Sequence, residues 1–203
     1  IAAVLALLKA SNAQETETIL TQQQFVLNFD TTLFQELDAK KTAEKLYALL
    51  KETPISSDSI DDEKIKELET AFLQACALEG IQEGKTTISD QLTLLKMDSE
   101  TEKYLTSENV KMIADVGVRM KKEVYQNLSE FQSALIQSVV LSVVRYPDGS
   151  GEIKNVIKTY AEQIGIQNPS EESSVYSRLA GKDLKDYSEL RTAYQTACAT
   201  KDN

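Results

Sequence analysis

The sequence predicts an all-α fold, a bundle of about seven to nine helices with a central hydrophobic helix near residues 134–146. Apolar residues recur every three or four positions along most of the 203 residues, as they do on the buried faces of amphipathic helices. Ser, Thr or Asp precedes many of these runs and Gly or Pro follows them, which is typical of helix starts and stops. Residues 134–146 are apolar on all sides, as expected of a fully buried helix. Their β-branched content also allows a buried strand, but the sequence has no second strand-like run to pair with it.

Four helices are expected in the first half of the chain. Thr21–Gln24 matches a capping box and would begin the first. Pro54 ends the second, because the residue before a proline disfavours helical dihedral angles. The polar segment 59–62 begins the third, which Gly80 follows as a left-handed cap, and Thr87–Asp90 opens the fourth. The expected apolar faces are Phe25, Val26, Phe29, Leu33 and Leu37; Ala43, Leu46, Tyr47 and Leu50; Ile65, Leu68, Phe72 and Ala75; and Ile88, Leu92 and Leu95.

The second half continues the helical pattern around one strong turn. Ser107 begins a fifth helix, and Ser129 caps the next one, with Gln132 three residues on. Pro147–Gly151 has the composition of a turn, and the helix after it stops at Gly165. The expected apolar faces are Val110, Ile113, Gly117, Met120, Val124 and Leu128 in the fifth helix; Ile153, Val156, Ile157, Tyr160 and Ile164 after the turn; Val175, Tyr176 and Leu179 in a short helix ended by Gly181; and Leu184, Tyr187, Leu190, Tyr194 and Ala197 in the last.

The first residues resemble the end of a secretory signal peptide. Ile1–Leu8 is an unbroken apolar run, and small residues ending with Ala13 occupy the two positions that a signal peptidase reads. We therefore expect residues 1–13 to be the remnant of a leader that is cleaved after Ala13. The alternative is a short amphipathic helix packed on the rest of the protein. Residues 14–203 are expected to form a single helical domain, and the turn at 147–151 is where a subdivision would fall.

Charge and hydropathy restrict the partners of the protein. The formal net charge is −10, which disfavours binding to nucleic acid, because phosphate recognition needs clustered Lys and Arg. Anionic membrane surfaces repel an acidic chain for the same reason. No stretch reaches the length of apolar sequence that spans a bilayer, so we expect no stable membrane insertion.

The chain contains no His. This absence removes Ser-His-Asp and Cys-His catalysis and His-ligated metal sites. The acidic pairs in the sequence are neighbours that point in different directions on a helix, so they do not form the facing carboxylates of a glycosidase. We therefore expect a protein that is not an enzyme, with no catalytic residue, no metal site and no cofactor.

Two kinds of covalent modification are expected in an exported protein. Cys76 and Cys198 are the two cysteines, and an even count favours one disulfide between them. The alternative is two separate buried thiols, because each lies in an apolar helical context. Asn127–Ser129 is an N-glycosylation sequon, which makes Asn127 a candidate glycosylation site.

Residues 64–79 read Lys-Ile-Lys-Glu-Leu-Glu-Thr-Ala-Phe-Leu-Gln-Ala-Cys-Ala-Leu-Glu. This stretch resembles the third helix of the N-terminal domains of spider-silk proteins (spidroins), where a Lys and an apolar residue begin the helix and Ala-Phe and small residues follow. The resemblance extends over residues 14–124. It includes a preceding helix with Phe25 and Phe29 and the helix start Thr86–Ile88.

The resemblance implies a five-helix bundle that acts as a soluble dimerisation module gated by pH, in which protonation of clustered carboxylates permits dimerisation. It also implies an ion pair between a Lys at the start of the third helix, which Lys64 matches, and an Asp near the second helix, to which Asp38 lies close. The chain departs from the family because it has no Trp and only three Met. The part from Leu128 onward has no counterpart.

From these observations we expect a secreted, non-enzymatic helical protein. It would assemble with itself or associate with other secreted proteins in extracellular material, in a silk-like structural role. The alternative is a carrier of lipid or another small hydrophobic ligand, because a helical bundle with many aliphatic residues can open an apolar cavity between its helices.

Overall fold

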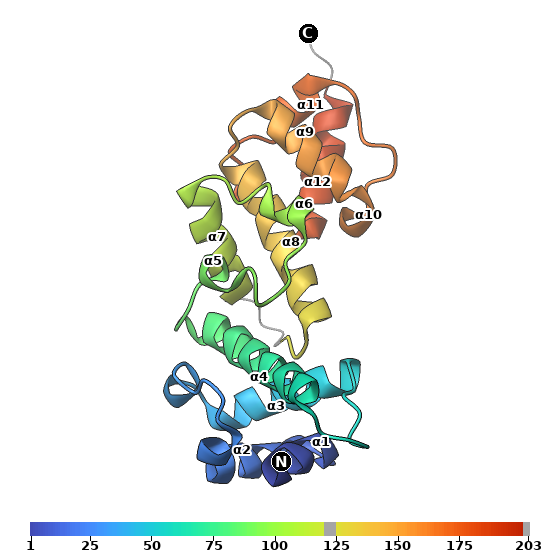
Figure 1. The fold of residues 1–203 in the computed structure, drawn as a ribbon. Coiled ribbons are helices and arrows are strands. Elements are labelled where there is room, and N and C mark those ends of the chain that lie inside the picture. The colour runs from blue at the N-terminus through green and yellow to red at the C-terminus, as the bar shows by residue number, and fades with distance from the viewer. Residues whose placement is uncertain (120–124, 201–203) are drawn as a thin grey trace. The chain divides into compact units, whose positions relative to one another are not determined.

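The computed structural model describes residues 1–119 and 125–200, except for the side chains of Gln24 and Phe25. Within these ranges it contains twelve α-helices, eight of them with seven or more residues, and no strand. The structure is 67% helical, which confirms the all-α prediction (Figure 1). No helix in the described ranges combines the length and the hydropathy needed to cross a lipid bilayer.

Contacts within the chain divide it into two compact units. The first comprises Ile1–Met97 and Val118–Gln132, and the second comprises Asp98–Gly117 and Ser133–Asn203. Each unit is therefore built from two segments of the sequence, and each has its own buried apolar residues.

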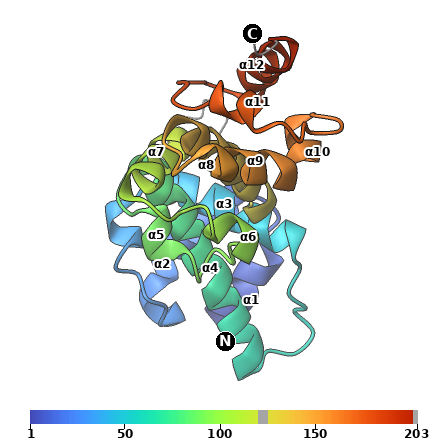
Figure 2. The same cartoon turned by 90° about the horizontal axis from the view of Figure 1, so that it is seen from above.

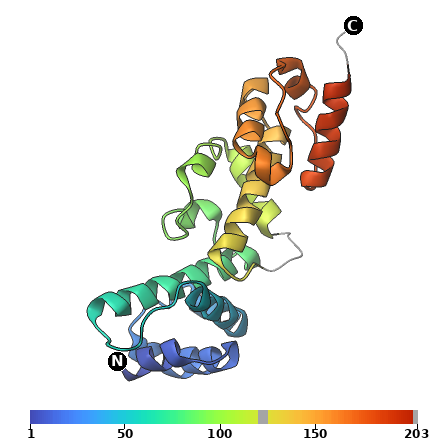
Figure 3. The ribbon, with the colours of Figure 1, turned by 90° about the vertical axis from the view of Figure 1, so that its right-hand side faces the viewer.

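The first unit is a stack of helices in which α1 packs on α2, α2 on α3 and α3 on α4 (Figure 3). Phe72 of α4 lies in the core, with its ring centroid 5.6 Å from that of Phe29 and 5.5 Å from that of Phe34. The helical elements of this unit are α1 (Ala2–Lys9), α2 (Ala13–Leu27), the 3-10 turn η1 (Phe34–Glu36), α3 (Ala39–Glu52), α4 (Asp62–Glu83) and α5 (Ile88–Gln91).

The prediction of a helix over residues 25–37 is wrong. The expected capping box Thr21–Gln24 lies inside α2, which begins at Ala13. The side chain of Asn12 caps α2 by accepting a first-turn N–H at 2.9 Å. The helix ends at Asn28, whose left-handed conformation (φ 56°) turns the chain out of the helix. The apolar residues beyond it keep a spacing of three or four but lie in a loop that contains η1.

The starts of α4 and α5 were predicted correctly, and the end of α4 was not. Asp61 caps α4 by accepting the Lys64 N–H at 2.9 Å, and Thr87 caps the four-residue α5. Gly80 lies inside α4, because the left-handed cap is Gly84 (φ 72°), one turn later.

The second unit is built mainly from the last five helices. α11 packs against both α9 and α12, and α10 packs against the same two helices (Figure 2). Gly165 ends α10 in the left-handed conformation (φ 80°), as the sequence predicts. The helical elements that contribute to this unit are α6 (Ser99–Glu102), α7 (Glu108–Arg119), α8 (Leu128–Arg145), α9 (Ser150–Thr159), α10 (Ala161–Ile164), α11 (Ser173–Ser177) and α12 (Tyr187–Ala199).

The hydrophobic segment 134–146 lies in α8 up to Arg145, as predicted, and all four of its valine side chains are buried. The buried hydroxyl of Ser142 donates to the Ser138 carbonyl at 2.6 Å, so it needs no partner outside the helix. Gly117 of α7 lies against Ser138, since a Cβ at Gly117 would be 2.8 Å from the Ser138 Oγ. The turn at 147–151, which links α8 to α9, lies inside the second unit and does not separate the two units.

The fifth predicted helix corresponds to α7. Ser107 caps it by accepting the Val110 N–H at 3.2 Å. Met120 and Val124, which we expected on the same helix, lie outside the described residues. Leu128, expected at its end, is the first residue of α8.

Candidate functional site

A lysine and a glutamate in the first unit form a buried ion pair. Lys45 Nζ of α3 lies 2.5 Å from Glu79 Oε2 of α4, and the two side chains are 1% and 0% exposed. Charged side chains are rarely buried to this degree, because each ion loses its hydration and only a close partner offsets that cost. The pair is therefore the candidate functional site of the unit.

The remaining groups around the pair come from α3 and from the segment before α8. Lys41 Nζ lies 3.8 Å from Glu79 Oε1, and its side chain is 55% exposed. Within the described residues this Oε1 accepts no hydrogen bond. Lys45 Nζ also lies 5.9 Å from the ring centroid of Tyr125, a distance at which a cation is attracted to the ring face. The buried Tyr125 hydroxyl donates to the Leu78 carbonyl at 3.3 Å.

Burial raises the pKa of the Glu79 carboxyl above its ordinary value. The Lys45 ammonium acts in the opposite direction, and the Glu83 carboxyl, one turn later on α4, raises the pKa further. Burial also raises the pKa of Tyr125, so Tyr125 stays neutral when Glu79 titrates. Glu79 is thus a carboxyl that takes up a proton at a less acidic pH than a solvated glutamate does.

The sign of the effect on stability follows from the raised pKa. The folded unit binds the Glu79 proton more tightly than the unfolded chain does. The stability that this proton contributes is complete below the ordinary glutamate pKa and is lost as pH rises through the raised value. Acidification from neutral pH therefore favours the folded first unit through this residue.

Asp38 and Lys64, which the resemblance implied as an ion pair, act separately at helix starts. Asp38 caps α3 by accepting the Lys41 N–H at 3.0 Å. The Lys64 ammonium donates to the Ser59 carbonyl at 2.6 Å. Among the ion pairs of the described residues, those that join the second and third predicted helices are Lys45–Glu79 and Lys41–Glu79.

The two cysteines are free thiols, so the expected Cys76–Cys198 disulfide is not formed in this structure. Cys76 is buried in α4 of the first unit, and burial raises the pKa of its thiol to about 12. Cys198 is exposed on α12 of the second unit. The alternative of two separate thiols holds, but only Cys76 is buried.

Asn127, the candidate glycosylation site, caps α8. Its Oδ1 accepts the Glu130 N–H at 2.9 Å, and the Glu130 carboxylate accepts the Gln126 N–H at 2.7 Å. Asn127 therefore has the capping role that we expected of Ser129. Because the cap uses Oδ1, the Nδ2 atom to which a glycan is attached is not the capping atom.

The buried pair was not expected from the sequence, although the sequence contains a signal for it. Thr42, Lys45, Leu46 and Leu49 follow the spacing of one helix face, and all four are buried. Glu79 lies seven residues, or two helical turns, after the buried Phe72, so it is on the same buried face of α4. A charged residue in register with an apolar face can therefore be found from the sequence, but its partner on another helix cannot.

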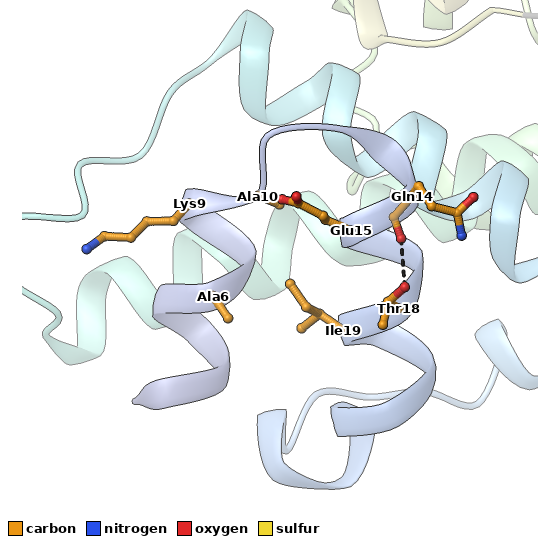
Figure 4. A pocket seen from close by; sticks show the side chains of 7 residues that line it. All are labelled: Ala6, Lys9, Ala10, Gln14, Glu15, Thr18 and Ile19. Atoms are coloured by element: carbon orange, nitrogen blue, oxygen red, sulfur yellow. Dashed lines mark hydrogen bonds between the residues drawn. The ribbon is translucent and has the colours of Figure 1, made fainter.

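A second feature of the first unit is an open apolar hollow of about 370 Å³ between α1 and α2. Ala6 of α1 and Ile19 of α2 point toward one another across it, while the Lys9 side chain extends away (Figure 4). A smaller hollow of about 150 Å³ lies on another side of α1, lined in part by Tyr47 and Leu50 of α3.

Within the described residues, no three Cys, Asp or Glu side chains converge in a way that would hold a metal ion.

In comparisons with known proteins, no family model, no characterised protein and no solved structure was found to match the chain.

Proposed function

We propose that the chain is a secreted, non-enzymatic helical protein that associates with itself, or with other secreted proteins, in extracellular material. The observation that carries the proposal is an acidic chain of net charge −10 that leaves large aliphatic side chains exposed. Val26 is 69% exposed and Met112 is 55% exposed. Side chains of this kind are stabilised when a partner covers them, whereas like charges keep copies apart.

Acidification is the condition that we propose for association. Protonation of surface carboxylates reduces the repulsion between copies, so apolar contacts become sufficient to hold them together. This response has the same direction as the pH-gated dimerisation that the spidroin resemblance implies.

Export is supported by the sequence of residues 1–13. The apolar run Ile1–Leu8 has the character of a leader. In the folded chain α1 packs on α2 with Ala3, Val4 and Leu7 buried, as the alternative of a packed amphipathic helix requires, and the expected cleavage point after Ala13 lies in the first turn of α2. Cleavage of a leader would therefore precede folding of this part of the chain. The absence of His from the chain supports a role without catalysis.

Size-exclusion chromatography with light scattering at pH 7.5 and pH 5.5 tests the proposal. We expect a monomer at pH 7.5 and a dimer or larger species at pH 5.5. A monomer at both pH values, with no associated species in mixtures with other proteins secreted by the same tissue, would contradict the proposal.

A second candidate function, carriage of a small hydrophobic ligand, is favoured by the hollow between α1 and α2. Its volume of about 370 Å³ lies within the range of small-molecule pockets. The hollow is open to solvent, whereas such pockets enclose most of their ligand, so we place this function second. Native mass spectrometry of protein from its natural source tests it, and a ligand-free mass in every preparation would rule it out.

A further inference from the structure

One peptide bond of the chain is chemically set apart from the others. Asp148–Gly149 is the single Asp–Gly step in the sequence, and the sequence contains no Asn–Gly step. The carboxyl group of an aspartate can reach the backbone nitrogen of the next residue and close a five-membered ring, a reaction that is favoured because both groups belong to one molecule. Glycine has no Cβ to crowd that nitrogen. The sequence therefore singles out one bond for a reaction between side chain and backbone.

The structure leaves both reacting groups accessible. Asp148 and Gly149 are exposed in the turn between α8 and α9, and a Cβ on Gly149 would meet nothing within 4 Å beyond its chain neighbours. In the part of the chain that the structure describes, the Gly149 N–H donates no hydrogen bond and the Asp148 carboxylate accepts none. No other partner therefore holds the nitrogen and the carboxyl group apart.

Other aspartates of the chain are held by hydrogen bonds. Asp38 and Asp61 each cap a helix by accepting the N–H three residues later, at 3.0 and 2.9 Å. Asp58 is the closest comparison to Asp148, because it too is exposed outside a helix. It is followed by a serine, however, and its carboxylate accepts a serine hydroxyl at 3.1 Å. Asp58 is therefore a suitable internal control for the reaction at Asp148.

We propose that Asp148–Gly149 is a site of spontaneous isoaspartate formation. The Gly149 nitrogen attacks Asp148 Cγ, and the new C–N bond closes a succinimide ring. The amide proton and the hydroxyl group of the carboxylic acid leave together as water. Water then adds to one of the two ring carbonyls. Addition at Cγ restores aspartate, whereas addition at the backbone carbonyl gives isoaspartate, in which the main chain runs through Cβ and Cγ. Nothing is oxidised or reduced, and the inference does not rest on the proposed function.

Isoaspartate at residue 148 weakens the start of α9. Gly149 precedes α9 and has no side chain with which to cap it. The Asp148 N–H donates to the Glu152 carboxylate at 2.8 Å, and the Glu152 N–H donates to the Gly149 carbonyl at 3.1 Å. Isomerisation inserts a methylene group between these two sites, so both bonds cannot keep their geometry. The buried apolar residues of α9 lie beyond this turn, so the unit stays folded while the modified fraction increases with the age of the chain.

Prolonged incubation of the folded 203-residue chain at pH 7.5 tests the proposal. Isoaspartate is located by peptide mapping with electron-transfer fragmentation, which distinguishes it from aspartate, and is quantified by enzymatic methylation of isoaspartyl carboxyl groups. We expect residue 148 to accumulate at least about tenfold more isoaspartate than Asp58 does. Equal accumulation at the two positions would overturn the proposal.

Two variants separate this reaction from other changes at the turn. Gly149→Ala should fold as the wild type does, because φ is 166°, which is extended backbone, and a Cβ there meets open space. The added Cβ crowds the nitrogen, so accumulation should fall at least about tenfold. Asp148→Glu keeps the charge but requires a six-membered ring, so it should give no isomerised residue 148. Isomerisation at the wild-type rate in Gly149→Ala would contradict the attack by this nitrogen.

A synthetic peptide of residues 144–153 shows whether the folded turn leaves the bond reactive. We expect the folded chain to convert at no less than about one tenth of the rate of the peptide. A slower folded chain would mean that the turn protects the bond, and the inference would fail.

Hydrogen exchange on the separated isoaspartyl form measures the effect on α9. The amides of the first turn of α9 should exchange about fivefold faster or more, as expected from the loss of a cap, and those of α12 should be unchanged. Unchanged protection throughout α9 would refute the effect on this helix.

Discussion

Replacement of Lys45 by Met should destabilise the first unit severely, because it leaves the Glu79 carboxylate buried without its partner. The two side chains are 1% and 0% exposed, and their charged atoms are 2.5 Å apart. Removal of one member of such a pair costs about 3–5 kcal/mol. This cost corresponds to roughly a 10²–10⁴-fold larger population of the unfolded unit.

Native-state hydrogen exchange is the assay, because it reports the two units separately. At pH 7.5, Lys45→Met should speed exchange of the α3 and α4 amides by that factor and leave α9, in the second unit, unchanged. Lys41→Met is the matched control. Its ammonium is 3.8 Å from Glu79 and its side chain is 55% exposed, so its loss should cost less than about 1 kcal/mol.

The double variant Lys45→Met/Glu79→Met separates pairing from packing. Replacement of a buried ion pair by apolar side chains of similar size is often neutral or stabilising, so the double variant should recover most of the stability that Lys45→Met loses. At pH 5 the cost of Lys45→Met alone should shrink, because the Glu79 carboxyl takes up a proton. If Lys45→Met costs no more than Lys41→Met at pH 7.5, the pair is not buried as described.

Three further predictions follow from the same structure. The free energy of unfolding of the first unit should rise between pH 7.5 and pH 5, and Glu79→Gln should flatten that rise; an identical pH profile for the variant, by urea unfolding, would refute the role of this carboxyl. Gly84→Ala should lose on the order of 1 kcal/mol in the same assay, because φ is 72° and the Arg119 side chain must move. Gly149→Ala is the control, since a Cβ there meets nothing within 4 Å, and equal losses would contradict this explanation. In the folded protein a thiol reagent should modify Cys198 alone, and Cys76 only after unfolding; rapid modification of both cysteines, or of neither, would contradict their burial.

The fold class followed from the sequence because helical periodicity is a local property. The stripe Ile153, Val156 and Ile157 on α9 is buried as predicted. The same periodicity failed over residues 29–37, where the apolar residues are needed by the core but the backbone leaves the helix at Asn28. Phe29 is buried as expected, but Leu33 and Leu37 are only half-buried and Val26 is 69% exposed. Phe34, which the spacing did not mark, is the other buried residue of this stretch.

Gly80 and the buried ion pair show a second limit. Gly80 was expected to end a helix, but it lies inside α4, where a Cβ would be 3.0 Å from the Thr86 side chain. The small residue meets a requirement for close packing that the sequence alone does not reveal. Lys45 and Glu79 are 34 residues apart, and their pairing depends on how α3 packs on α4, which no local pattern specifies.

Sedimentation of the wild-type chain across pH tests the central claim most directly, because it measures association without any substitution. We expect one monomeric species at pH 7.5 and a reversible, concentration-dependent dimer at pH 5.5, at concentrations up to about 0.5 mM. A single monomeric species at both pH values over that range would contradict it.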